Sequence, residues 1–211
     1  MAGASIVVVS AGLSVPSSTR LLADQLSAAT DRALRLADVE AEFRVIEVRE
    51  LAHDLANNLL TGFPAGDLAV ALEDLVHADG VIAVTPIFSA SFSGLFKTFF
   101  DVVEEGGLTG TPVLIGATGG TARHSLALEF AVRPMFAYLK AAVAPTGVFA
   151  ASEDFGAVAA GSTPLSGRVD QAGRELAELV LGNRPTGGAG NPFDNPTPFE
   201  HLLGRGGTPP A

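Results

Sequence analysis

The sequence SIVVVSAGLSVPSST, residues 5 to 19, places an unbroken apolar run directly before a loop rich in hydroxyl side chains. An apolar run of this kind is typical of a strand covered on both faces, as in a parallel sheet. Residues 17–36 continue with a helical spacing of Leu and Ala, so the loop joins a strand to a helix. A strand, a short loop and a covering helix form the repeating unit of α/β proteins.

The same alternation continues along the chain. Further strands are predicted at residues 43–48, 80–85, 111–118 and 143–149, and further helices at residues 67–78, 93–103, 122–142 and 165–181. Residues 50–66 are predicted to form one short helix and a loop, and Pro134 is expected to kink or split its helix. Five strands alternating with helices indicate an α/β fold, a doubly wound parallel sheet with helices on both faces. Ligands of such sheets bind beyond the carboxyl ends of the strands.

We expect one domain over residues 1–182, followed by a tail over residues 183–211. The tail is rich in Pro and Gly, which favours a flexible segment without a core of its own. The alternative is that Phe199, Leu202 and Leu203 dock on a neighbouring subunit.

Charge and composition argue against several classes of function. The net charge of −10 argues against binding to nucleic acid or to an anionic membrane surface. The chain has no Cys, which excludes disulfides and thiolate catalysis and fits a cytoplasmic protein. No apolar stretch reaches the roughly 18 residues that span a bilayer. The four His are scattered without the spacing of metal ligands.

The first loop has the composition of a phosphate site. Its helix starts near Ser17, so free N–H groups and the positive end of the helix dipole point into the loop. Neither G-x-G-x-x-G nor G-x-x-x-x-G-K-S is present, which argues against a nicotinamide-type Rossmann site and a nucleoside triphosphatase. Arg20 is the only flanking cation. The alternative is that Ser17 or Ser18 only caps the helix. The loop offers five hydroxyls, those of Ser10, Ser14, Ser17, Ser18 and Thr19.

The second loop follows the strand at residues 80–85. Pro86 is expected to end that strand, after which the chain runs extended and the N–H groups of Ile87, Phe88 and Ser89 face a ligand. Phe88 would form a flat apolar wall for an aromatic ring. The alternative is a plain connection in which Phe88 and Phe92 fill the core.

The third loop has two glycines, Gly119 and Gly120, after a strand and before a helix start capped by Thr121. Such a backbone nest can donate hydrogen bonds to a carbonyl or a developing anion. The alternative is a tight turn that needs glycine only for a positive φ.

The combination of loops resembles that of the NAD(P)H-dependent FMN reductases of the flavodoxin-like superfamily, above all those that supply reduced flavin to luciferase-type or sulfonate monooxygenases. The resemblance covers roughly residues 5–150 and implies a five-stranded parallel sheet in the order 2-1-3-4-5. It rests on the first loop, on Thr85-Pro86-Ile87-Phe88 with Gly94-Leu95-Phe96-Lys97 and Asp101, and on Ala117-Thr118-Gly119-Gly120-Thr121 with His124; Arg133-Pro134 and residues 146–150 extend it.

The resemblance implies a role for each loop. The implied reaction passes hydride from NAD(P)H to the flavin N5 and reduced FMN to a monooxygenase, and it needs neither a catalytic side chain nor a metal ion because the cofactors carry the chemistry. Ser10, Ser17, Ser18 and Thr19 would bind the FMN phosphate; Pro86, Ile87, Phe88 and Ser89 would line the ring near N5; Thr118, Gly119, Gly120 and Thr121 would reach its pyrimidine end.

The chain also departs from these relatives. Many carry Arg where Ser14 or Val15 stands, and many carry Tyr in place of Phe88, which implies loosely held FMN that serves as a substrate as much as a prosthetic group. The alternatives are a quinone-type or azo-type reductase with tightly bound FMN, and a non-enzymatic flavodoxin-like electron carrier.

The helix over residues 92–103 is apolar on nearly all sides, which exceeds what a helix with one buried face needs. We therefore predict a homodimer or homotetramer in which this helix packs on another subunit.

Overall fold

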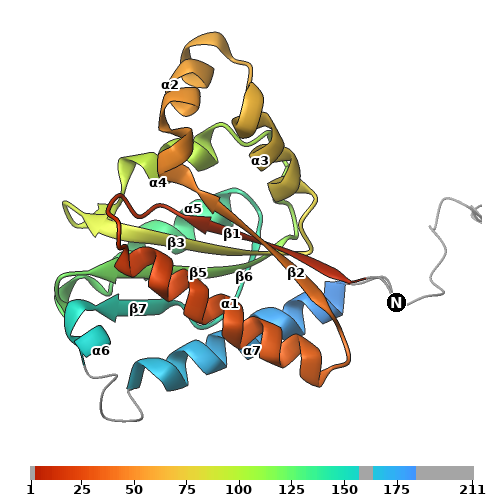
Figure 1. Ribbon diagram of the computed structural model, residues 1–211, viewed down its shortest axis with the longest axis vertical. Coiled ribbons are helices and arrows are strands. Elements are labelled where there is room, and N and C mark those ends of the chain that lie inside the picture. Colours follow the sequence, from red (N-terminus) through yellow and green to blue (C-terminus); the bar gives the residue numbers. More distant parts are fainter. Residues whose placement is uncertain (1–2, 157–163, 184–211) are drawn as a thin grey trace, which may run out of the picture.

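A parallel sheet organises the chain (Figure 1), and the computed structural model describes residues 3–156 and 164–183. The parallel strands run in the order β2-β1-β3-β5, and β6 and β7 both pair with the remaining edge of β5. With β6 and β7 counted as one broken strand, this is the flavodoxin-like order 2-1-3-4-5, so the predicted fold is confirmed. The strands are β1 (Ala4–Ser10), β2 (Ala41–Glu47), β3 (Gly80–Phe88), β4 (Ser91–Phe92), β5 (Pro112–Gly119), β6 (Ala142–Val143) and β7 (Val148–Ala151).

Two features raise the number of strands from the predicted five to seven. The short β4 returns antiparallel onto the end of β3. The predicted fifth strand is interrupted between β6 and β7, where Pro145 lacks the N–H group of a strand ladder. Arg133 occupies the interruption from one face of the sheet, because its guanidinium donates to Ala144 O at 3.0 Å and to Pro145 O at 2.9 Å.

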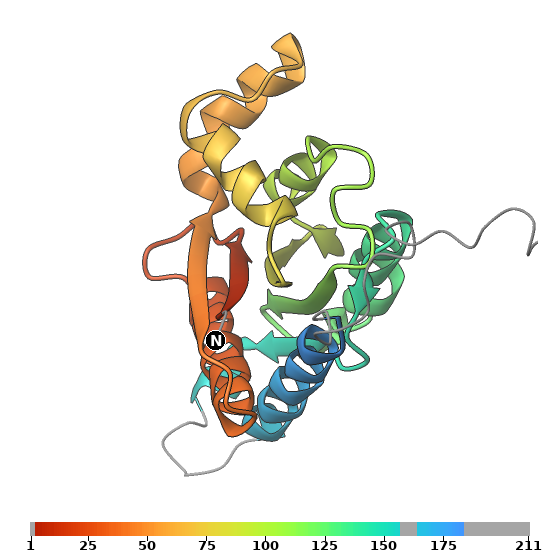
Figure 2. The same cartoon turned by 90° about the vertical axis from the view of Figure 1, so that its right-hand side faces the viewer.

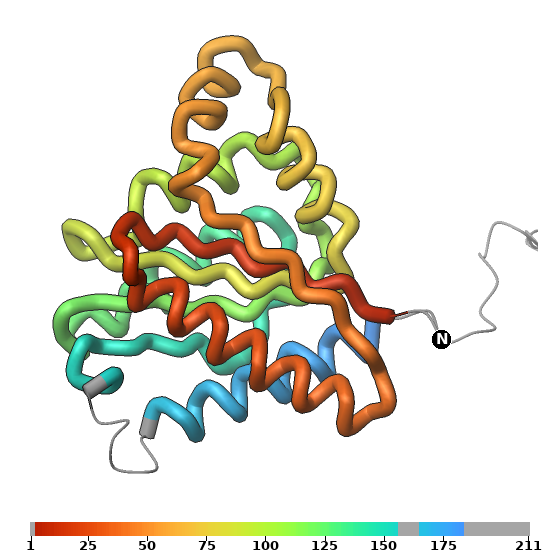
Figure 3. The backbone as a smooth tube through the Cα atoms, viewed as in Figure 1, coloured from red at the N-terminus to blue at the C-terminus, as the bar shows by residue number. Residues whose placement is uncertain are grey.

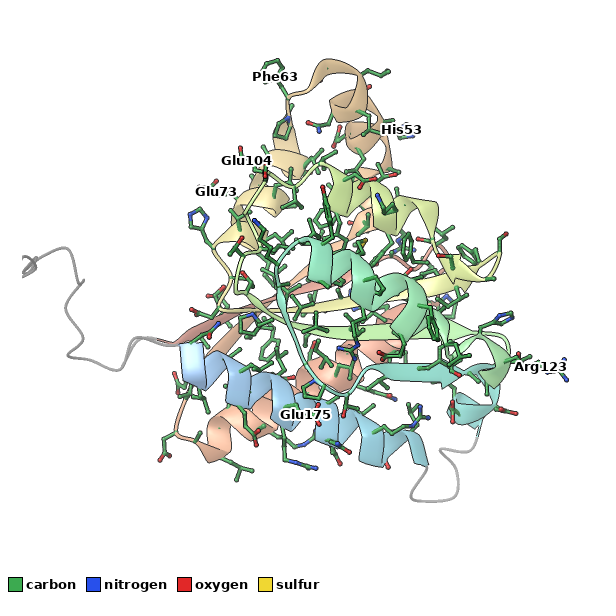
Figure 4. The ribbon with its side chains drawn as sticks, turned by 180° about the vertical axis from the view of Figure 1, so that it is seen from behind. His53, Phe63, Glu73, Glu104, Arg123 and Glu175 are labelled. Atoms are coloured by element: carbon green, nitrogen blue, oxygen red, sulfur yellow. The ribbon has the colours of Figure 1, made fainter. Side chains whose placement is uncertain are left out.

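Glu175 joins the same interruption from the opposite face (labelled in Figure 4). Its carboxylate accepts hydrogen bonds from the backbone N of Thr146 at 2.6 Å and from Thr146 Oγ1 at 2.8 Å. Burial alone would raise the pKa of Glu175, but the hydrogen bonds from Gln171 and Thr146 outweigh it and hold that pKa below its usual range. The broken strand is thus held by side chains where backbone pairing fails.

Helices cover both faces of the sheet (Figures 1 and 2). Along β1, Ile6 and Val8 pack with the first helical layer and Val7 and Val9 with the second, so the strand is buried on both sides as its apolar run predicts. The first layer holds α1 (Ser18–Leu36) and α7 (Pro164–Asn183); the second holds η1 (Val48–Leu51), α2 (Ala52–Thr61), α3 (Gly66–Val76), α4 (Gly94–Asp101), η3 (Leu128–Val132) and α5 (Arg133–Tyr138). Two short turns, η2 (Ala122–His124) and α6 (Ser152–Gly156), follow β5 and β7.

The predicted helix over residues 122–142 is broken more strongly than expected. It divides into η2, the π-helical turn η3 and the six-residue α5, with Pro134 in the first turn of α5. Pro134 has no N–H and cannot continue a regular helix, so the wider π turn precedes it. Lys140 adopts a left-handed φ of 59°, which ends the helical run before β6.

The predicted tail over residues 183–211, and with it the docking of Phe199, Leu202 and Leu203, lies outside the described residues except for Asn183. None of the helices in the described ranges is long and apolar enough to cross a membrane.

The contact between α1 and α7 yields a test of the packing. Gly173 of α7 lies against α1, where an added Cβ would approach the backbone C of Ala29 to 2.7 Å and the backbone N of Thr30 to 2.8 Å. We expect Gly173→Ala to lower the free energy of unfolding by about 1–3 kcal/mol, because backbone cannot move aside as a side chain can. Chemical denaturation of the purified protein measures the change.

Gly167→Ala is the matched control in the same helix, since no atom lies within 4 Å of its added Cβ. This substitution should raise the free energy of unfolding by roughly 0.5–1 kcal/mol through helix propensity. Equal effects of the two substitutions would contradict the close α1–α7 packing.

Candidate functional site

The three loops singled out in the sequence leave the sheet at one edge (Figures 1 and 3). β1, β3 and β5 are parallel neighbours, with Ser10 opposite Val84 and Pro86 opposite Thr118. Their carboxyl ends therefore open side by side, as in other doubly wound sheets that bind ligands there.

Two direct hydrogen bonds join the loops. The backbone N of Ala11 donates to Val84 O at 3.0 Å, which fastens the first loop to β3. The Oγ1 atoms of Thr19 and Thr118 lie 2.8 Å apart and share a buried hydrogen bond between the start of α1 and the end of β5. The first and third loops are therefore held within bonding distance of each other.

The first loop folds onto the start of α1. Ser17 is the N-cap residue with an extended backbone, and its Oγ accepts from the backbone N of Arg20 at 3.2 Å. A Cβ on Gly12 would overlap the Ser17 Oγ, so glycine lets the loop pass this close. Ser17 therefore does cap the helix, as the alternative proposed. Its hydroxyl group only accepts in this bond, so its proton can still be donated to a ligand.

The four residues predicted to bind phosphate divide into two pairs. Ser17 and Ser18 lie partly or fully at the surface at the helix start. Ser10 and Thr19 are buried, with 0% and 2% of their surface exposed, and their side chains do not reach solvent. The Thr19 hydroxyl is hydrogen-bonded to that of Thr118, and the Ser10 hydroxyl has no hydrogen-bond partner among the described residues.

The second loop differs from the extended connection expected from the sequence. β3 does not end at Pro86 but continues to Phe88 and turns back as β4, with Ser89 and Ala90 at left-handed φ values of 47° and 67°. Pro86 is tolerated within β3 because the N–H group that it lacks would point toward β1. The pairing between β1 and β3 ends at Val84, so no hydrogen bond is lost there. The backbone of Ile87 and Phe88 pairs with β4, so part of the expected ligand cradle serves the hairpin.

Phe88 stands at the end of this hairpin with 48% of its surface exposed. The alternative in which it fills the core does not hold, whereas Phe92 does pack partly against the core. Thr85 anchors the base of the hairpin, because its buried Oγ1 accepts from the backbone N of Ser93 at 3.1 Å and donates to Pro86 O at 3.0 Å. An apolar ring is therefore presented at the open edge of the sheet on a fixed base.

The third loop is open at its tip. Gly120 and Thr121 are exposed, and nothing lies within 4 Å of a Cβ added to Gly120. Neither Gly119 nor Gly120 has a positive φ, so the turn alternative based on positive φ is wrong. Gly119 is required for close packing instead, since an added Cβ would lie 2.8 Å from Cζ of Phe149. Thr121 precedes η2 without forming the expected side-chain cap.

Two arginines lie near the first loop. Arg20 is paired with Asp24 and Glu47, each at 2.7 Å, and the hydrogen bonds that its guanidinium donates to these carboxylates raise its pKa. Arg49, which follows β2, was not found from the sequence; its Nη1 donates to Ser14 O at 3.3 Å. No local pattern signals this contact, because it joins residues far apart in the chain.

Two titratable side chains beside the third loop, those of Arg123 and His124, face solvent. Arg123 projects away from the edge (Figure 4), and His124 beside it is also exposed. Within residues 3–156 and 164–183, no three His, Asp or Glu side chains gather as metal ligands would. The edge therefore offers neutral hydroxyl and amide donors, one exposed ring and an open glycine turn, a donor set that fits a flavin mononucleotide.

Comparison with known proteins shows the family of the chain. Residues 4–156 match the family model described as NADPH-dependent FMN reductase. The chain belongs to this family. Membership confirms the predicted class of enzyme, an FMN reductase that uses a nicotinamide cofactor.

Two curated FMN reductases and one solved oxidoreductase structure are similar to this chain. The FMN reductase (NADPH) of Pseudomonas aeruginosa is 34% identical over 84% of this chain and 92% of its own length. The NADH-dependent FMN reductase SfnF of Pseudomonas fluorescens is 33% identical over 82% of this chain and 90% of its own. The crystal structure of an oxidoreductase from Corynebacterium diphtheriae, 41% identical, superposes with a TM-score of 0.80 and covers 85% of this chain and 98% of that one.

The bond between Thr19 and Thr118 yields a prediction. Thr118→Val removes one partner and leaves the buried Thr19 hydroxyl unpaired, so we expect the free energy of unfolding to fall by about 1–3 kcal/mol and FMN binding to weaken. Thermal unfolding and titration of flavin fluorescence measure the two effects.

The double variant Thr19→Val with Thr118→Val is the control, because removing both hydroxyls leaves neither unpaired. It should regain much of the stability that the single variant loses. A double variant less stable than the single one would show that the two hydroxyls do not act as a pair.

Proposed function

We propose that the three loops at this edge form the FMN site of the enzyme, with the phosphate at the first loop and the ring between the second and third. The observation that supports this most directly is the buried Thr19–Thr118 bond, which holds the first and third loops together. The proposed contacts are Ser17 and Ser18 with the phosphate, Pro86 to Ser89 with the ring near N5, and Thr118 to Thr121 with its pyrimidine end.

The phosphate end depends on the start of α1. The backbone N–H groups of Ser18 and Thr19 belong to the first turn, where they have no partner within the helix and add to the positive end of its dipole. Together with the hydroxyls of Ser17 and Ser18 they form a cradle of neutral donors. Ser10 and Thr19, predicted as ligands, contribute through their buried side chains only by shaping this cradle.

The ring end is built for access from one side. Phe88 at the end of the β3–β4 hairpin offers an apolar wall, and its 48% exposure leaves room for a second planar molecule such as nicotinamide. When bound, FMN supplies the hydride-accepting N5 atom. The hairpin positions the ring for this transfer and takes no proton.

The third loop stabilises charge. Reduced flavin is negative near N1 and the C2 oxygen, and in the proposed site the amides of the exposed Gly120 and Thr121 donate hydrogen bonds to this charge. Gly119 precedes them as the last residue of β5, where it pairs with Ala151 of β7. Preorganised amides of this kind favour the reduced form without a charged side chain. The Thr121 hydroxyl, which makes no cap bond, is a further donor.

We propose that reduced FMN leaves the site and serves a flavin-dependent monooxygenase. Open access at Phe88 and a phosphate loop without a cation of its own support an exchangeable flavin. Release of FMN on gel filtration, followed by FMN-dependent oxidation of NADPH and NADH, is the expected result. FMN that stays bound through turnover with quinones preferred as acceptors would favour the quinone-type alternative, and an absence of nicotinamide oxidation would favour the electron carrier.

Gly120→Asp tests the third loop. The new carboxylate lies in open space, so the fold should be kept, but its charge opposes the negative charge of reduced flavin. We expect kcat for FMN reduction to fall roughly ten- to hundredfold, a smaller loss than the roughly hundred- to thousandfold caused by removing an oxyanion-hole donor. Gly120→Ala is the control and should stay within about twofold of the parent by the same reasoning.

The helix at residues 92–103 does not supply the surface expected for a homodimer or homotetramer, because its large apolar side chains are buried or partly buried within the chain. The aromatic side chains of α4 pack within the chain. The ring of Phe100 meets that of Phe96 and that of Phe136 of α5 edge to face, with centroids 4.9 Å and 4.8 Å apart. Two highly exposed aromatic side chains lie instead on the neighbouring η3 and α5, where Phe130 is 77% and Tyr138 85% exposed. We propose that a second copy covers this face, which borders a groove of about 780 Å³ between α4 and α5.

Sedimentation analysis of the purified protein tests the assembly. We expect a dimer or tetramer at micromolar concentration, and we expect Phe130→Glu with Tyr138→Glu to shift it toward monomer because charges would enter an apolar contact. Leu60→Glu on α2, another exposed apolar position at 87%, is the control. A monomeric parent protein would reject the proposed assembly.

A further inference from the structure

Arg49 reaches the first loop from a neighbouring strand. β1 and β2 are parallel partners with Ser10 opposite Glu47, so the segments that follow both strands leave the sheet at the same edge. There the Nη1 of Arg49 donates to Ser14 O at 3.3 Å, within the loop assigned to the phosphate. A guanidinium thus lies against a loop that contains no cation between Ser10 and Thr19.

The backbone of Arg49 is fixed by its neighbours. It lies in the turn η1, whose residues Val48 and Leu51 are buried in the core with 0% and 7% exposure. The backbone N of Ala52 donates to Arg49 O and closes the turn. The side chain is 28% exposed, so the guanidinium starts from a rigid base and remains accessible.

Arg20, the cation nearest in sequence, is not suited to an additional anion. Its guanidinium is held by Asp24 and Glu47, and the Glu47 side chain is only 14% exposed. One positive and two negative charges make this group net negative. It therefore adds to the unfavourable field that a protein of net charge −10 presents to a phosphate.

Arg49 is held much more weakly. Its nearest carboxylate is that of Glu50 at 3.7 Å, which is beyond hydrogen-bond distance, and the Glu50 side chain is 69% exposed. An exposed pair of this kind contributes little, and the Ser14 carbonyl is a neutral acceptor. A guanidinium carries five N–H donors, so the bond to Ser14 leaves others for an oxyanion.

We propose that Arg49 supplies the positive charge for the phosphate group of FMN, acting from the end of β2 rather than from the first loop itself. This inference rests on the proposed FMN site. It makes Arg49 the residue that distinguishes a phosphorylated flavin from riboflavin, because charge-assisted bonds to phosphate are roughly twice as strong as neutral ones.

The experiment compares FMN with riboflavin, which has the same ring but no phosphate. Titration of flavin fluorescence with the full chain gives the dissociation constant of each. We expect Arg49→Gln to weaken FMN binding roughly tenfold or more and to change riboflavin binding by less than about twofold. The dissociation constant of Arg49→Lys for FMN should lie between those of the parent and of Arg49→Gln, because lysine keeps the charge but lacks the planar, forked donors of a guanidinium. Added salt should weaken FMN binding to the parent more than to Arg49→Gln.

Arg44→Gln is the matched control, on β2 itself just before the turn that holds Arg49. Arg44 pairs with Asp74 at 2.6 Å and its side chain is 53% exposed, so its substitution should leave the binding of FMN and of riboflavin unchanged. Unchanged FMN binding in Arg49→Gln would overturn the inference, and so would an equal loss of FMN and riboflavin, which would mean that Arg49 only holds the loop at Ser14. If the parent protein binds neither flavin, the proposed function itself fails, and that outcome is distinct from both.

Discussion

Parallel pairing of β1, β3 and β5 is the constraint on which the site depends. Because the strands run in one direction, all three carboxyl ends open at one edge, and the register sets Ser10 beside Val84 and Pro86 beside Thr118. Each strand is buried on both faces, so a slip of one residue would exchange the side chains of two packed cores. Packing of the two cores therefore fixes where the loops begin. The hydrogen bond between Thr19 and Thr118 then holds together two loops that the sheet has already brought close.

Charge poses the second constraint, since an acidic protein must bind an anion. Helix-start amides and hydroxyls carry no net charge and act only at short range. A cation placed among carboxylates, as Arg20 is, contributes no net positive field. Arg49 differs because β2 ends beside β1 and because its acidic neighbour Glu50 points into solvent. The sheet order that gathers the loops also decides which arginine lies against the first loop.

The regular part of this arrangement could be predicted from the sequence, and the local departures could not. An unbroken apolar run and a clear helical period place β1 and α1 within a residue or two, and the alternation of elements gives the fold. The β3–β4 hairpin escaped prediction because Ser89 and Ala90 are not the residues usually found at left-handed turn positions. Arg49 and the burial of Ser10 depend on contacts between distant segments, which periodicity and composition do not report.

The hydroxyl side chains of the edge separate into two functions that composition alone does not distinguish. Those of Thr19 and Thr85 are buried and join segments of backbone, so their loss acts first on stability. Those of Ser18 and Thr121 are exposed and that of Ser17 is half-buried, so these three are accessible to a ligand. In the proposed site the phosphate end is thus built on buried bonds, whereas the ring end rests on a half-exposed Phe88 at the end of a hairpin. On the proposed site, affinity for flavin is set mainly at the phosphate and the ring is left accessible for hydride transfer. This arrangement is consistent with the proposed release of reduced flavin.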